Sequence, residues 1–102
     1  MDFFDSFHHF LETAFLLTEL NQLCSNKKEI VDLNECRQAA DFFKMNVDIK
    51  EETNPMWPRG CYAANDGKDD VYFNKIKVGS KNKDGRQICK SMSKNGIFIM
   101  FD

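Results

Sequence analysis

The stretch NPMWPRGCYAANDGKDDVYFN, residues 54–74, holds the only tryptophan, both prolines and both tyrosines of a 102-residue chain. Neither Pro55 nor Pro58 suits a helix interior, so they hold Trp57 in an extended segment. The runs GCYAA and VYFN are typical of strands, and the Asp-Gly pair at 66–67 between them supplies the positive-φ position of a turn. The stretch therefore predicts a hairpin with a wide loop or a bulge.

The concentration of these rare residues has a structural interpretation. Trp57 supplies a large apolar plug, and Gly60 lets the backbone pass close to a neighbour. Tyr62 and Tyr72 either face each other or cover opposite faces of the hairpin. We therefore expect the cluster to pin a strand onto the helix that precedes it. The alternative is that Trp57 and the two tyrosines line a ligand surface.

A helix is predicted upstream, over residues 33–45. Asp32 and Glu35 are spaced as in a capping box, which satisfies free amides at a helix start. One helical face then carries residues at i, i+3, i+4 and i+7, namely Cys36, Ala39, Ala40 and Phe43. The predicted fold class is α+β, with this helix packed across a small antiparallel sheet of residues 60–64, 71–74 and 86–90. A last apolar strand is expected at Ile97–Phe101.

The N-terminal residues predict an amphipathic helix over residues 3–20. Their apolar positions recur at a period near 3.5, at Phe3, Phe7, Phe10, Ala14 and Leu17. Acidic residues at the start and a glutamate in the centre distinguish the segment from a signal peptide, so we assign it to the mature chain. No apolar run reaches the roughly 20 residues that span a bilayer. The expected division is an N-terminal helix, 1–23, and a small domain, 24–102.

The four cysteines are Cys24, Cys36, Cys61 and Cys89, and no two are closer than twelve positions. Zinc sites usually bring two ligands within a C-x2-4-C step, so neither a metal nor another cofactor is predicted. Two disulfides in a small domain are the favoured interpretation, which indicates an oxidising compartment. Four reduced core cysteines in a cytosolic protein are the alternative.

Candidate catalytic residues are few. His8 and His9 have no nucleophile motif beside them and are interpreted as solvent-facing. The densest oxygen cluster, at Asp66, Asp69, Asp70 and Asn74, departs from the spacing of a calcium-binding EF-hand loop and is interpreted as a solvated turn. We therefore predict that the protein is not an enzyme.

Charge is unevenly distributed along the chain. Residues 1–74 carry 7 Lys and Arg against 14 Asp and Glu, whereas residues 75–102 carry 7 against 2. The overall charge of −2 argues against a general nucleic-acid binder. A solvated loop face is the favoured interpretation of the basic stretch 75–94, and contact with an anionic partner is the alternative.

Four motifs in order, ECRQAADFF, WPRGCY, VYFN and QICK, resemble a small cysteine-containing domain of uncharacterised cnidarian and marine-algal proteins. The resemblance covers residues 24 to 90 and leaves out the first 20 residues and the tail GIFIMFD. Its layout of a helix followed by strands is distantly similar to PAN/apple modules, which are extracellular binding units. The resemblance therefore implies a binding role and no known activity.

Four cysteines allow three pairings, and we favour Cys36–Cys61 with Cys24–Cys89. Cys36 faces the core, and the proline-stiffened connector returns the chain to Cys61 on a neighbouring strand. Cys24 and Cys89 flank this unit, so their bond ties its ends, as in PAN-like modules.

The function expected from these observations is a non-catalytic interaction module, extracellular or in an organelle lumen, that binds a protein or a glycan. Nucleic acid is not an expected partner. The candidate partner surface comprises Phe3, Phe7, Phe10, Leu17, Trp57, Tyr62 and Tyr72. The alternative is a structural or accessory subunit that docks into a larger assembly, including a membrane-associated one, through the N-terminal apolar helix.

Overall fold

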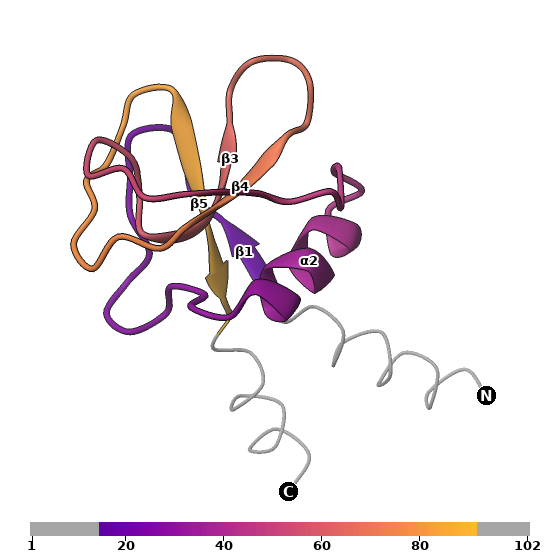
Figure 1. Ribbon diagram of the computed structural model, residues 1–102, viewed down its shortest axis with the longest axis horizontal. Coiled ribbons are helices and arrows are strands. Elements are labelled where there is room, and N and C mark those ends of the chain that lie inside the picture. Colours follow the sequence, from indigo (N-terminus) through magenta and orange to yellow (C-terminus); the bar gives the residue numbers. More distant parts are fainter. Residues whose placement is uncertain (1–14, 92–102) are drawn as a thin grey trace, which may run out of the picture.

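One helix and five strands form the part of the chain that the structure, a computed structural model, describes: residues 15–91 (Figure 1). In chain order they are β1 (Phe15–Leu17), α2 (Leu33–Phe42), β2 (Lys50–Glu52), β3 (Gly60–Ala64), β4 (Val71–Asn74) and β5 (Gly85–Lys90). The strands form one sheet in the order β1-β5-β3-β4-β2. The α+β class is therefore confirmed, as are the three strands expected at 60–64, 71–74 and 86–90.

The sheet is mixed, which corrects the expectation of a purely antiparallel one. Strands β1, β5, β3 and β4 pair antiparallel, but β2 lies parallel to β4. The sequence favours a connector over residues 47–58, an acidic stretch that ends in Pro55 and Pro58, and Lys50–Glu52 within it has no apolar alternation. As an edge strand, β2 needs no apolar face, since much of its surface stays in water.

Helix α2 begins where the capping box predicts and ends three residues earlier than expected. The Asp32 side chain accepts a hydrogen bond of 2.9 Å from the Glu35 amide. At the other end, Lys44 adopts φ +60°. The Lys44 amide donates a hydrogen bond to the Asp41 carbonyl, and the Met45 amide donates one to the Ala40 carbonyl. This is the Schellman arrangement, with lysine where glycine is usual.

The helix expected over residues 3–20 is wrong for residues 15–20, and residues 3–14 lie outside the described residues. Phe15–Leu17 is strand β1, paired with β5 so that Leu16 lies opposite Cys89 and Leu17 opposite Ile88. Phe15 and Leu17 pack against the core while Leu16 is exposed, which is strand alternation. The strand expected at Ile97–Phe101 also lies outside the described residues.

The core lies between α2 and one face of the sheet, as Figure 1 shows for the position of the helix. Its buried members are Ile30, Cys36, Ala39, Ala40, Cys61, Ala63, Val71, Phe73 and Ile88. Small side chains at Ala39 and Ala40 let the helix approach the sheet closely. Because side chains alternate along a strand, Tyr62 and Gln87 point to the opposite face, here called the outer face.

Both predicted disulfides are present. Cys36–Cys61 joins α2 to β3 with a Cα–Cα distance of 5.4 Å, and Cys24–Cys89 joins the segment after β1 to β5 at 5.6 Å. Cys36 and Cys61 belong to the core, whereas Cys89 follows Ile88 and lies on the outer face. Each face of the sheet is thus crosslinked, which fits an oxidising compartment.

Candidate functional site

Three stacked aromatic rings lie on the outer face. The Tyr62 ring lies between those of Trp57 and Tyr72, with centroids 5.1 Å apart and interplanar angles of 12° and 11°. Tyr62 and Tyr72 are directly opposite each other on β3 and β4, so these two rings face each other. Of the two arrangements predicted for them, this is the one in which they do not cover opposite faces of the hairpin. Trp57 was expected to pin the sheet onto the helix. That expectation is wrong, because the ring packs on the face away from α2.

The Tyr62 ring is buried, and its hydroxyl donates a hydrogen bond to the Glu52 carboxylate. Burial raises the pKa of Tyr62 far above its ordinary value, and the bond to Glu52 raises it further. Since the Tyr62 hydroxyl stays protonated, its hydrogen bond to the Glu52 carboxylate joins β3 to the edge strand β2.

Asn74, at the end of β4, holds the loop that carries Trp57. Its buried Nδ2 donates to the carbonyl oxygens of Asn54 (2.7 Å), Trp57 (3.2 Å) and Pro58 (3.0 Å). Its Oδ1 accepts from the amides of Asn54 (2.9 Å) and Ile76 (3.3 Å). One side chain thus satisfies much of the backbone of a loop that has no sheet partner of its own.

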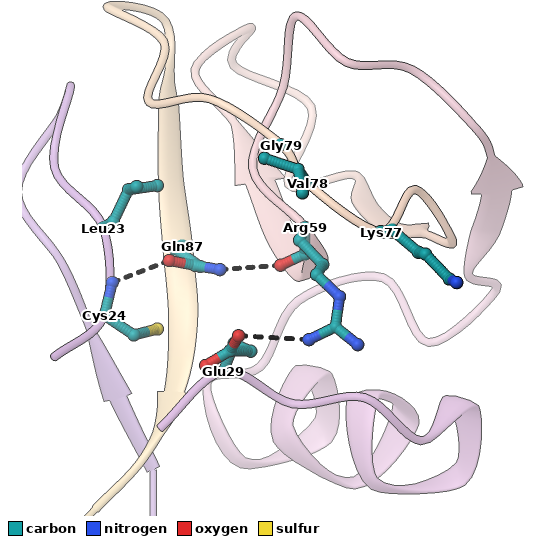
Figure 2. Close-up of a pocket in the computed structure, with 8 residues that line it drawn as sticks. All are labelled: Leu23, Cys24, Glu29, Arg59, Lys77, Val78, Gly79 and Gln87. Carbon is teal, nitrogen blue, oxygen red and sulfur yellow. Dashed lines mark hydrogen bonds and ion pairs between the residues drawn. The ribbon is translucent and has the colours of Figure 1, made fainter. Parts of the chain in front are cut away.

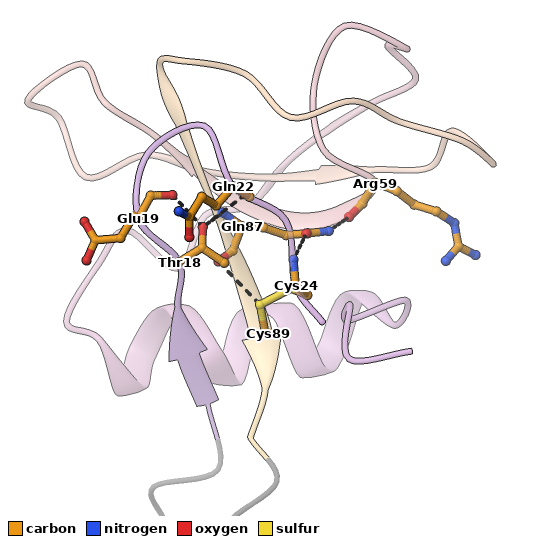
Figure 3. Close-up of a disulfide and its surroundings, with 7 residues drawn as sticks. All are labelled: Thr18, Glu19, Gln22, Cys24, Arg59, Gln87 and Cys89. Atoms are coloured by element: carbon orange, nitrogen blue, oxygen red, sulfur yellow. Dashed lines mark hydrogen bonds between the residues drawn. A yellow bond between two sulfur atoms is a disulfide. The ribbon is translucent and has the colours of Figure 1, made fainter. Parts of the chain in front are cut away.

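Gln87, in the middle of β5, also holds loop backbone through its side-chain amide. Its buried side-chain amide accepts from the Cys24 amide and donates to the Arg59 carbonyl, both at 2.6 Å (Figure 3). Its backbone amide donates to Thr18 Oγ1 (2.9 Å), and its carbonyl accepts from the Thr18 amide (3.0 Å). Gln87 therefore joins two loops that are far apart in sequence, beside the Cys24–Cys89 disulfide.

Gly60 sets the position of the residue before it, Arg59. Gly60 adopts φ +82°, and a Cβ there would collide with the carbonyl oxygen of Ile30. Only glycine allows the two backbones to come this close. With its own carbonyl held by Gln87, Arg59 projects its side chain from a fixed backbone.

A cavity of about 200 Å³ opens above Gln87. Its lining residues are Leu23, Cys24, Glu29, Arg59, Lys77, Val78, Gly79 and Gln87. Figure 2 shows Leu23 and Cys24 on one side, Arg59, Val78 and Gly79 on the other, and Gln87 between them. Leu23 is 46% exposed and Val78 is 78% exposed, so two aliphatic side chains stand at the rim of a polar floor.

The charged groups of this cavity are two cations and one carboxylate. The Arg59 guanidinium lies 3.0 Å from the Glu29 carboxylate, and both side chains are about one-third exposed. Within residues 15–91, no carboxylate pairs with Lys77. The cavity can therefore accept an anionic group next to an apolar one. The four cysteine sulfur atoms are bonded in disulfides, so none is a thiolate nucleophile.

The structure brings together Trp57, Tyr62 and Tyr72 of the predicted partner surface and places Leu17 on the other face. Trp57 and Tyr72 are half-buried, Tyr62 is 1% exposed, and Leu17 packs against the core on the other face. Phe3, Phe7 and Phe10 lie outside the described residues, as do His8 and His9.

The oxygen-rich stretch at 66–74 was interpreted as a solvated turn, and Asp66 and Asp69 are exposed as this interpretation expects. Asp70 accepts from Asn46 Nδ2 and pairs with Lys50, Asp66 accepts from the Lys68 amide, and Asn74 serves the Trp57 loop. Across residues 15–91 there is no group of three or more His, Cys, Asp or Glu side chains placed to hold a metal ion. Over the same range, no helix is both long and apolar enough to span a bilayer.

Sequence reasoning missed Glu29, Arg59 and Gln87. The signal for Gln87 was present, because a polar residue two positions before Cys89 in an otherwise buried strand requires hydrogen-bond partners. Arg59 carried no such signal, since its position depends on Gly60 and on a loop contact made by Gln87.

A scan against protein-family models finds no match, and neither do searches of curated proteins and of solved structures. The resemblance carried by the four motifs thus stays a prediction.

Proposed function

We propose that this protein is a non-catalytic interaction module of an extracellular or lumenal compartment and that it binds a protein or glycan partner at the cavity above Gln87. The observation that carries the proposal is the contrast between the floor and the rim of this cavity. The polar atoms of the floor are satisfied within the chain, while Leu23 and Val78 remain exposed at the rim.

This contrast favours binding over chemistry. Gln87 uses its amide group in holding two loops, so it has a structural task and is not free to act on a substrate. The exposed aliphatic side chains gain free energy when a partner covers them, at about 25 cal/mol per Å² of apolar surface removed from water. Two crosslinks keep the surface rigid, so little conformational entropy is lost on binding.

The resemblance to PAN/apple modules predicted from the motifs implies the same class of function, and the two disulfides support an oxidising setting. The alternative of a structural subunit docked by an N-terminal helix keeps less support. Its apolar stripe was expected to continue to Leu17, but Phe15–Leu17 is a strand of the sheet.

The proposal is tested with the oxidised, fluorescently labelled full chain on arrays of glycans and of peptides from secreted proteins. We expect saturable binding to at least one class, abolished in the double variant Leu23→Ser/Val78→Ser. Met56→Ser is the matched control, since Met56 is 68% exposed but does not line the cavity. Binding that survives the double variant, or an absence of binding to every probe, would overturn the proposal.

A further inference from the structure

We infer that the cavity above Gln87 and a second cavity that shares Arg59 with it form one groove that binds an extended acidic peptide segment with aliphatic side chains. This inference rests on the proposed function and names the class of partner. The juxtaposition that carries it is a row of three cations, Arg59, Lys75 and Lys77, beside three exposed aliphatic side chains.

The second cavity has a volume of about 160 Å³. Its lining residues are Val31, Arg59, Gly60, Phe73, Asn74, Lys75 and Ile76. Because Arg59 lines both cavities, and because residues 75–79 run from the second cavity into the first, the two are parts of one surface. Each is smaller than the roughly 300–1,000 Å³ of a small-molecule pocket, so each suits a single side chain.

The charge of the groove favours an anionic partner. Arg59, Lys75 and Lys77 line it against the single carboxylate of Glu29, although the whole chain carries −2. Lys75 lies 3.5 Å from Glu51, with both side chains about half exposed, and such a surface pair holds its partners weakly. Among the described residues no carboxylate pairs with Lys77, so its charge is available to a ligand.

The apolar lining favours a peptide over a sugar. The exposed apolar side chains are aliphatic: Leu23 and Val78 in the first cavity and Val31, 52% exposed, in the second. None of the three stacked rings of Trp57, Tyr62 and Tyr72 lines either cavity. An extended peptide directs successive side chains to opposite sides, so one set can meet the cations while the other set covers the aliphatic side chains.

The groove is also fixed before a ligand arrives. Gln87 and the Cys24–Cys89 disulfide hold the floor of the first cavity, and Asn74, which lines the second, holds the loop before Arg59. Binding therefore orders side chains at the rim without reshaping the backbone.

The test is an amide-shift titration of the oxidised, ¹⁵N-labelled full chain by NMR. The probe is a capped hexapeptide of alternating glutamate and leucine; the comparators are its glutamine–leucine analogue and a heparin-derived tetrasaccharide. We expect the acidic peptide to shift amides near 23, 31, 59 and 75–78, and to bind less tightly as salt rises. Lys77→Glu weakens this binding about fivefold or more, whereas Lys81→Glu leaves it nearly unchanged, since a rim charge acts over a short screened range. Lys81 is an exposed lysine of the same segment that lines neither cavity.

Three results would overturn the inference. Equal affinity for the glutamine analogue would remove the role of charge, and equal weakening by the two lysine variants would show unspecific attraction. Binding of the tetrasaccharide but not the peptide would replace the partner class while leaving the proposed function in place. The array experiment with Leu23→Ser/Val78→Ser judges the proposed function separately, because those variants change no charge.

Discussion

Replacing Asn74 by alanine is expected to destabilise the fold more than any exposed polar substitution, because one buried side chain serves five backbone groups. Its Nδ2 lies 2.7–3.2 Å from three carbonyl oxygens, and its Oδ1 lies 2.9 Å and 3.3 Å from two amide nitrogens. The three carbonyl oxygens share the two protons of Nδ2, so the side chain makes at most four full hydrogen bonds, and at roughly 1 kcal/mol for each the upper bound is about 4 kcal/mol. Since water can reach part of the opened loop, we expect a loss of about 3–4 kcal/mol.

The assay is urea unfolding of the oxidised protein, followed by circular dichroism and by the fluorescence of Trp57, the only tryptophan. Asn82→Ala is the matched control, because the half-buried Asn82 donates one 3.0 Å bond to the Met56 carbonyl of the same loop and accepts only one other, of 2.8 Å, from the Asp84 amide. It should cost about 1 kcal/mol or less. In thermal melts, the loss of stability expected for Asn74→Ala corresponds to a decrease in Tm of about 15–25 °C for a domain of this size.

The two probes also distinguish local from global effects. If Asn74 only fastens the loop, Trp57 fluorescence changes at lower urea than the circular dichroism signal of the sheet. If the loop and the sheet unfold as one unit, both signals move together. A stability for Asn74→Ala within about 1 kcal/mol of Asn82→Ala would refute the reasoning, since it would mean that the five contacts contribute almost nothing.

Three further predictions follow from single sites. Gly60→Ala should lower the free energy of unfolding in urea by about 3 kcal/mol or more, because the positive φ and a collision with the Ile30 carbonyl add together. Gly67→Ala, at φ +77° with open space around it, should lower it by about 1–2 kcal/mol. Equal losses in the two variants would contradict the collision. The raised pKa of Tyr62 means that the unfolded chain releases this proton first, so stability should fall as pH rises above about 10, and Tyr62→Phe should flatten that fall in pH-dependent unfolding. Replacing both cysteines of Cys24–Cys89 by serine should lower the free energy of unfolding by about 4 kcal/mol, and replacing those of Cys36–Cys61 by about 3.5 kcal/mol. The first loss is larger because the disulfide closes a loop of 65 residues and the second one of 25. The reverse order would contradict the chain-entropy argument.

Sequence reasoning located the elements whose signals are local. The start of α2 follows from Asp32 and Glu35, and the hairpin of β3 and β4 follows from two apolar runs around an Asp-Gly pair. The end of α2 had no such signal, since Lys44 takes the left-handed position that glycine usually marks. The disulfide pairing was predictable because both the helix face of Cys36 and the chain order of the cysteines are visible in the sequence.

The failures lie where tertiary contacts decide between local alternatives. Phe15–Leu17 fits the helical stripe of the N-terminal segment, but it also fits a strand, and pairing with β5 selects the strand. Lys50–Glu52 has no strand pattern at all and is paired only because β4 offers a free edge. In both cases the partner strand supplies hydrogen bonds that no local propensity reveals.

The position of Trp57 shows a different limit. Its proximity in sequence to Cys61 suggested that both residues serve the helix-facing core. Trp57 instead stacks on Tyr62, one residue further along the strand, and so belongs to the outer face. A shift of one residue in a strand changes the face, and the irregular loop between Pro55 and Pro58 gives the sequence no fixed register to count from.

The two faces of the sheet are closed by different physical means, and the groove lies where the loops of the outer face meet the edge of the core, since Gln87 and Asn74 line it together with Phe73. Burial of aliphatic and small side chains against α2 closes the inner face. On the outer face, Asn74 and Gln87 hold irregular loops through hydrogen bonds of their side-chain amides, so these polar atoms already have partners. The aliphatic side chains of the neighbouring loops stay exposed. Leu23, Val31 and Val78 can therefore change without disturbing either disulfide or the core. A surface of this kind allows the partner specificity to vary while the fold that supports it stays constant.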